Sequence, residues 1–121
     1  MEISVSVKGL DSLISKLRGF TTSADQIIQE TMLESAEQHI VVVAKALAPF
    51  KTGALRESIA ALPGEEPLQI LIVADKFYAR FLEYGTRFIP EGKFTFLRPA
   101  IEEGYENLVS DLQEKIEEEL N

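Results

Sequence analysis

The stretch Leu-Gln-Ile-Leu-Ile-Val-Ala, residues 68–74, is the strongest strand signal in the chain and is apolar enough to lie centrally in a sheet. Directly before it, Pro-Gly-Glu-Glu-Pro at residues 63–67 is a strong turn signal. On the far side of that turn, residues 55–61 are expected to be extended as well. These neighbouring segments predict that the middle of the chain forms the sheet.

The N-terminal part of the chain predicts one further strand and two helices. In residues 2–8, Ile and Val alternate with polar residues, which is the period of a half-buried strand. Apolar residues recur at helical spacing in residues 10–19 and predict a short amphipathic helix. Residues 23–26, Ser-Ala-Asp-Gln, have the form of a capping box. A second helix is expected from about residue 24 to about residue 48, because Pro49 disfavours helix in the residue before it.

The C-terminal part predicts a short helix, a short strand and a long final helix. Residues 78–82 carry apolar side chains at helical spacing before Gly85, and residues 93–96 alternate in the manner of a strand. Pro99 fits the first turn of the final helix. The apolar stripe of that helix is expected to consist of Ile101, Tyr105, Leu108, Leu112, Ile116 and Leu120.

This order of elements predicts an α+β fold. We expect a small antiparallel sheet of about four strands, packed with two N-terminal helices and a long C-terminal helix. The chain has 121 residues and 45% hydrophobic residues, so residues 1–121 are expected to form a single domain with its own core.

Composition and charge exclude several classes of function. The chain has no cysteine, which excludes disulfides and a catalytic thiol. Of the net charge of −8, −7 lies in residues 101–121, and no basic footprint for DNA binding is visible. The longest apolar run, Ile40 to Val43, is too short to cross a bilayer, and the N-terminus does not read as a signal peptide.

The sequence contains no recognisable catalytic motif. The only histidine, His39, is expected mid-helix, and nothing near it in the sequence suggests the positioned partner that a general base needs. Glu34, Glu37 and His39 do not match a zinc-binding HExxH helix, and the glycines form no phosphate-binding array. We expect no catalytic, cofactor-binding or metal-binding residues.

Two segments are not explained by composition: residues 48–59, and residues 78–86 with 94–100 soon after. Thr52 and Gly53 predict a tight turn. Glu83 is expected to accept backbone N–H bonds under the turn at Gly85 and Thr86. The alternative for Glu83 is an ion pair between subunits with Arg56, Arg80, Arg87 or Arg98.

These segments carry a resemblance to a known family. The stretches PFKTGALRESI, YARFLEYGT and FLRPAIEE, in this order, resemble elements of the head–tail joining proteins of long-tailed double-stranded DNA phages and prophages, also labelled neck, tail-completion or minor tail proteins. The resemblance covers essentially the whole chain, although residues 87–93 depart from the usual loop. Its signature positions here are Thr52, Gly53, Leu55, Ser58, Tyr78, Ala79, Glu83, Gly85, Thr86 and Pro99.

The resemblance implies a non-catalytic virion assembly protein without cofactors, located in the neck and, during assembly, in the host cytoplasm. Its implied partners are further copies in a ring, expected to be a hexamer, together with the head connector and tail proteins. DNA would be only passing cargo, and no membrane is involved. Residues 1–7, as a strand edge, or the loop of residues 85–92 could carry the contacts between subunits. A tail terminator, a non-viral interaction module and a small hydrolase using Glu83 stay as alternatives.

The acids of the last helix suggest a mechanism. Glu114, Glu117, Glu118 and Glu119 would repel DNA phosphates if they faced the lumen of a ring, within a Debye length of roughly 8 Å at physiological salt. The alternatives are that the helix faces outward and aids solubility, that its end frays, or that its end meets a basic partner.

Overall fold

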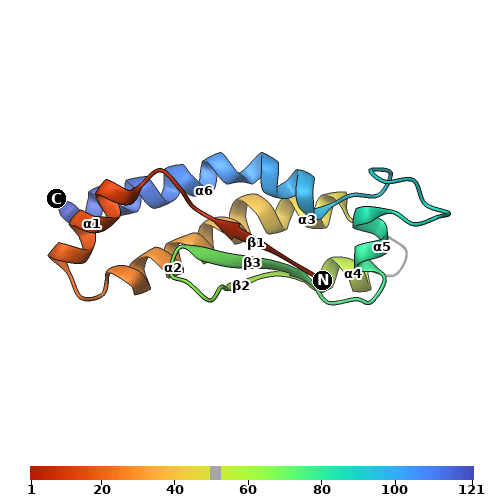
Figure 1. Cartoon of the computed structure of the whole chain (residues 1–121), viewed down its shortest axis with the longest axis horizontal. Coiled ribbons are helices and arrows are strands. Elements are labelled where there is room, and N and C mark those ends of the chain that lie inside the picture. Colours follow the sequence, from red (N-terminus) through yellow and green to blue (C-terminus); the bar gives the residue numbers. More distant parts are fainter. Residues whose placement is uncertain (50–52) are drawn as a thin grey trace.

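The protein was analysed as a computed structural model that describes residues 1–49 and 53–121. Its helices lie against one face of a small antiparallel sheet, which confirms the predicted α+β class (Figure 1). Within the described residues the sheet contains three strands, β1 (Glu2–Ser6), β2 (Ile59–Pro63) and β3 (Gln69–Ala74), in the order β1-β3-β2.

The strand predicted to be central is central. Both β1 and β2 pair antiparallel with β3, with Ile3 opposite Ile72 and Ala61 opposite the same residue. Alternate residues of β3 are buried, because one face of the sheet meets the helices. The other face is more open, and Leu62 on β2 is among the exposed large apolar residues.

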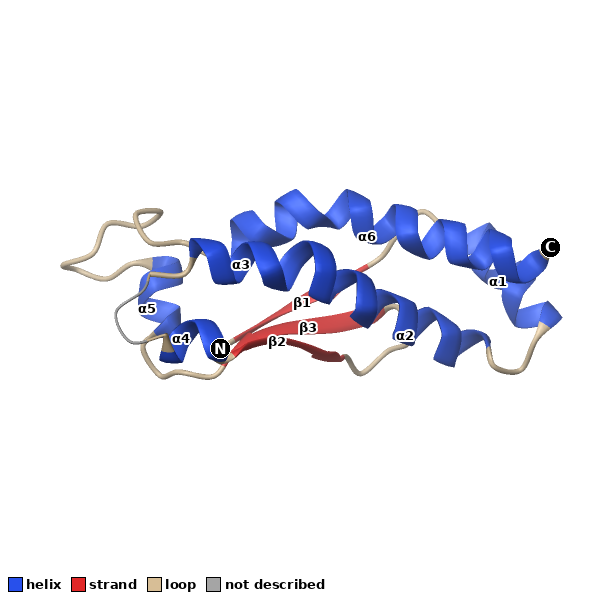
Figure 2. Cartoon of the chain, turned by 180° about the vertical axis from the view of Figure 1, so that it is seen from behind, coloured by secondary structure: helices blue, strands red, loops and turns tan. Residues whose placement is uncertain are grey.

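Three consecutive helical segments form one continuous helix, called the column below, that crosses the covered face of the sheet (Figure 2). It consists of α2 (Ala24–Ala36), a π-helical turn η1 (Glu37–Val41) and α3 (Val42–Leu47), and it confirms the second predicted helix. Before it comes α1 (Asp11–Phe20), as predicted. The long helix α6 (Leu97–Leu120) runs antiparallel beside this column, so that its C-terminus lies near α1 (Figure 1).

The other end of the molecule carries two short helices, α4 (Ala54–Glu57) and α5 (Ala79–Tyr84), beside the first turn of α6 and the N-terminus of the chain (Figure 1). The 24 residues of α6 span about 35 Å at 1.5 Å per residue. The two ends of the molecule are therefore separated by several Debye lengths.

Helix α6 approaches the column most closely at Gly104. A Cβ added there would overlap the carbonyl oxygen of His39 and lie 2.7 Å from Cγ1 of Ile40. The buried residues of α6 are Leu97, Ala100, Gly104, Leu108, Leu112 and Ile116. The predicted stripe is right at Leu108, Leu112 and Ile116, whereas its outer members Ile101, Tyr105 and Leu120 are only partly buried.

Three predictions of local structure were wrong. Residues 93–96 form no strand in the described chain, because the backbone N–H of Phe96 is bound by the Glu83 carboxylate and the chain turns there into α6. Residues 54–57 are helical, so the extended segment begins only at Ile59. In the described structure no capping box forms: the hydroxyl of Thr21 accepts the N–H of Ser23, and Gln26 donates to Glu30.

Candidate functional site

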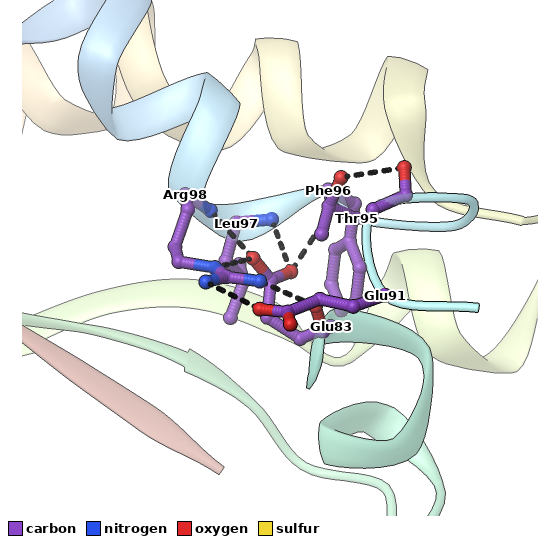
Figure 3. Close-up of polar contacts among 7 residues, drawn as sticks. Glu83, Glu91, Thr95, Phe96, Leu97 and Arg98 are labelled. Atoms are coloured by element: carbon purple, nitrogen blue, oxygen red, sulfur yellow. Dashed lines mark hydrogen bonds and ion pairs between the residues drawn. The ribbon is translucent and has the colours of Figure 1, made fainter. Parts of the chain in front are cut away.

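The most unusual polar group of the described structure is the carboxylate of Glu83, which is fully buried at the end of α5. Oε1 accepts the backbone N–H groups of Phe96 at 3.0 Å and Leu97 at 2.8 Å. Oε2 accepts the N–H of Arg98 at 3.0 Å and its Nε at 2.9 Å (Figure 3). The three backbone donors are free N–H groups at the start of α6, so Glu83 caps a helix whose first residue, Leu97, lies 14 residues later in the chain.

We call Glu83 together with the N-terminal turn of α6 the latch. The side chain of Arg98 makes further contacts in it. Its Nη2 donates to the carbonyl oxygen of Glu83 at 2.7 Å, and its guanidinium lies 4.7 Å from the centre of the Tyr84 ring. The exposed Glu91 lies 3.6 Å from Nη1. Glu83 therefore accepts backbone N–H bonds, as predicted, but from residues 96–98 and not from the turn at Gly85 and Thr86. Its ion pair with Arg98, predicted as a contact between subunits, forms within one chain.

The latch determines the charge state of Glu83. Burial alone raises the pKa of this carboxyl, but the three backbone N–H groups and the Arg98 side chain together outweigh burial, and the pKa is lowered from its usual value. A carboxylate held ionised by backbone donors fits a structural role. It does not fit a general acid or base, which needs a pKa near the working pH.

A tight loop follows the latch. Gly85 has φ +81°, and a Cβ there would lie 2.8 Å from both the nitrogen of Glu91 and the carbonyl oxygen of Ile89. The hydroxyl of Thr86 accepts the N–H groups of Phe88 and Ile89 at 3.1 Å each. The loop of residues 85–96 is therefore folded back onto itself and fastened to α6 through Glu83.

This arrangement exposes aromatic side chains at the α5 end. Phe77 and Phe88 are each 85% exposed, and Phe81 and Tyr84 are also among the exposed large apolar residues. We call these four residues the aromatic end. Soluble proteins seldom expose several large aromatic side chains in one part of the molecule unless a partner covers them.

Cations accompany the aromatic rings. The guanidinium of Arg80 lies 5.8 Å from the centre of the Phe81 ring, and that of Arg87 lies 5.5 Å from the Phe88 ring. Both arginines are exposed, and neither forms a salt bridge within residues 1–49 and 53–121. An arginine stacked on a ring keeps the edge of its guanidinium available for a carboxylate.

The remaining signature positions that the structure describes lie at the same end of the molecule. Thr52 lies outside the described residues. Gly53 has φ +81° and precedes α4, Leu55 is buried, and the hydroxyl of Ser58 donates to the carbonyl oxygen of Leu55 at 2.7 Å. Tyr78 precedes α5, the adjacent Ala79 is fully buried, and Pro99 lies in the first turn of α6, as predicted. Gly53, Leu55, Ser58, Tyr78, Ala79, Glu83, Gly85, Thr86 and Pro99 therefore lie on or beside α4, α5 and the start of α6.

The acids predicted to face a lumen do not share one environment. Glu114 and Glu118 line a groove of about 350 Å³ between α2 and α6, together with Glu34, Asp111 and Lys115. Glu117 is exposed and accepts a hydrogen bond from Gln113, while Glu119 pairs with Lys115 at 3.2 Å.

A polar network closes one wall of this groove. Oδ2 of Asp111 accepts a hydrogen bond from the buried hydroxyl of Ser35 at 2.7 Å and lies 3.1 Å from Nε2 of His39. His39 is half-buried, as predicted for a polar residue in a helix, but the expectation that it lacks a partner was wrong, because Asp111 of the distant helix α6 packs beside it. Among the described residues, no group of three or more acidic or histidine side chains is placed to hold a metal ion. No helix among residues 1–49 and 53–121 is both long enough and apolar enough to cross a bilayer.

Sequence reasoning missed Phe77 and Phe88, the most exposed aromatic residues, and the close approach at Gly104. Phe77 stands directly before Tyr78, so the available signal was two adjacent aromatic residues, which cannot both lie on the buried side of one helix. The signal for Gly104 was a small residue four positions after Ala100 and four before Leu108.

The comparisons with known proteins agree with the family resemblance and cover the first of its three stretches and nearly all of the second. Residues 11–85, more than half of the chain, match a family model described as "Bacteriophage HK97-gp10, putative tail-component". Neither the curated proteins nor the solved structures contain a match.

Proposed function

Because the chain belongs to the HK97-gp10-like family of bacteriophage tail components, we propose that it is a non-catalytic structural protein that joins head and tail as a subunit of a ring in the neck of the virion. The observation that carries this proposal is the aromatic end, held by the buried Glu83 latch. A surface of this kind suits binding to other phage structural proteins. Tail terminator is the second candidate, since it would use the same surface at the junction of tube and neck.

The latch supports a binding role over a catalytic one. Its carboxylate is fully buried, and all of its hydrogen bonds go to the chain's own backbone and to Arg98. A nucleophile or a general base would need to reach a substrate. Glu83 instead fixes the position of α5 and the loop of residues 85–96, which present Phe81, Tyr84 and Phe88.

The exposed side of α6 fits the passage of DNA through such a ring. Glu103, Glu106 and Glu117 are exposed, and their spacing of three and eleven residues brings them to one side of the helix. We propose that this side faces the lumen and repels phosphates at short range. Replacing the three residues by Gln should slow DNA ejection from assembled particles, and an unchanged ejection rate would exclude the lumen role.

The test of the joining role uses a phage or prophage in which the gene is deleted and supplied in trans. The variant Phe77→Ser/Phe88→Ser changes only exposed side chains, so its stability should equal that of the wild type. We expect unjoined heads and tails in electron micrographs. The matched control is Phe20→Ser, an exposed aromatic residue at the opposite end of the molecule, which should support joining. Normal joining by a stable Phe77→Ser/Phe88→Ser variant would exclude this surface.

A further inference from the structure

The described structure carries opposite charges at its two ends. Residues 76–98, around α5, contain five bases and two acids, whereas residues 111–121, the C-terminal half of α6, contain five acids and one base. The two regions lie toward opposite ends of the long helix: at 1.5 Å per residue, the acids of residues 111–119 lie about 20–35 Å along α6 from its first residue. At that distance they cannot neutralise one another within one chain, because salt screens exposed charges beyond roughly 8 Å.

The two regions also differ in shape and chemistry in a complementary way. The aromatic end exposes Phe88 and Phe77 together with Arg80 and Arg87, whose guanidinium groups form no salt bridge with any described residue. The opposite region is hollowed into the groove between α2 and α6. There, Glu114 and Glu118 form no hydrogen bond or ion pair with any other described residue, although Lys115 nearby is paired with Glu119.

We propose that the aromatic end of one copy docks on the α2–α6 groove of a second copy, with Arg80 and Arg87 facing Glu114 and Glu118. The occupant follows from charge complementarity: the aromatic end carries the exposed guanidinium groups, the groove carries the carboxylates, and both surfaces belong to the same chain. Stacking on Phe81 and Phe88 holds the guanidinium groups so that their edges reach carboxylates. The contact joins two different surfaces, so it is heterologous and repeats from copy to copy until it closes.

This inference rests on the proposed ring and states how its subunits meet. Glu114 and Glu118 belong to the contact between copies. Glu114 follows Glu103 by eleven residues, so this contact borders the side of α6 that carries Glu103, Glu106 and Glu117. The open face of the sheet, marked by Leu62, is the competing surface.

Charge reversal tests the contact. One variant carries Arg80→Glu/Arg87→Glu, and the other carries Glu114→Lys/Glu118→Lys. Each alone places like charges on both surfaces, so in sedimentation velocity each should stay monomeric at concentrations where the wild type associates. An equimolar mixture should regain association through alternating copies, and high salt should weaken it. Association of either variant alone at the wild-type level, or a mixture that stays monomeric, overturns the proposal.

Cross-linking covers the case in which the wild type associates too weakly to sediment as a complex. The chain contains no cysteine, so introduced thiols are the only ones. Chains with Arg87→Cys and with Glu118→Cys, mixed and oxidised, should give the mixed disulfide dimer above the ratio of random pairing. Chains with Leu62→Cys serve as the control for the open sheet face. Random pairing, or a preference for Leu62→Cys, overturns the proposal. Joining assays separate this result from the proposed function: if loss of the gene leaves joining intact, the function is wrong even when the cross-link forms.

Discussion

Replacing Glu83 by Gln tests whether the latch holds the site together. The carboxylate accepts four hydrogen bonds, two on each oxygen. Glutamine keeps one carbonyl oxygen, which can still serve Phe96 and Leu97. Its amide group then points at the N–H and Nε of Arg98, so donors face donors.

The magnitude follows from these contacts. Hydrogen bonds to a charged group contribute about 1.5–3 kcal/mol each, and removing one partner of a buried ionic contact costs about 3–5 kcal/mol. Because two such bonds on Glu83 are lost, we expect the free energy of unfolding to fall by about 3–5 kcal/mol. Domains of this kind have only about 5–15 kcal/mol in total, so the effect is large.

Urea unfolding followed by far-ultraviolet circular dichroism measures the loss, with an unchanged slope confirming that the transition stays comparable. Glu91→Gln is the matched control, because Glu91 is exposed and faces the same Arg98 at 3.6 Å. Its unfolding curve should overlay that of the wild type. A loss below about 1 kcal/mol for Glu83→Gln would refute the reasoning, since a typical neutral hydrogen bond alone contributes that much.

Three further predictions concern pH, packing and the aromatic end. Because the pKa of Glu83 is lowered in the folded protein, the unfolded chain binds the proton more readily. The stability that the latch contributes is therefore present above about pH 4.5 and is lost as pH falls through the pKa of Glu83 in the folded protein. The free energy of unfolding should fall more steeply with acid for the wild type than for Glu83→Gln. Gly104→Ala should lower the free energy of unfolding by about 1–3 kcal/mol, because its Cβ would overlap the carbonyl oxygen of His39. The control Gly19→Ala in α1 meets nothing within 4 Å and should be neutral or stabilising. Equal thermal midpoints for the two variants would contradict the close approach of α6. Phe88→Ser should leave the thermal midpoint unchanged and increase solubility, because this ring is 85% exposed; a marked drop in the midpoint would mean that the ring packs against the protein.

The local patterns of the sequence were sufficient for most elements. The apolar run of residues 68–74 specified the central strand, and helical spacing located the column of α2, η1 and α3 and the long α6. The errors lie where a distant group overrides local pattern. Residues 93–96 alternate like a strand, yet the carboxylate of Glu83 binds the N–H of Phe96 and the chain enters a helix.

The sequence by itself determined the α+β class, the family resemblance and the concentration of acidic charge in the last helix, because these depend on side-chain type and on spacing along the chain. Tertiary structure decided that Glu83 is paired with Arg98 inside one chain, and that Gly104 lies where two helices meet. It also placed the aromatic end and the acidic groove at opposite ends of one helix. These facts depend on which distant segments come together. The periodicity of apolar residues indicates helices and strands but does not indicate which of them pack against each other.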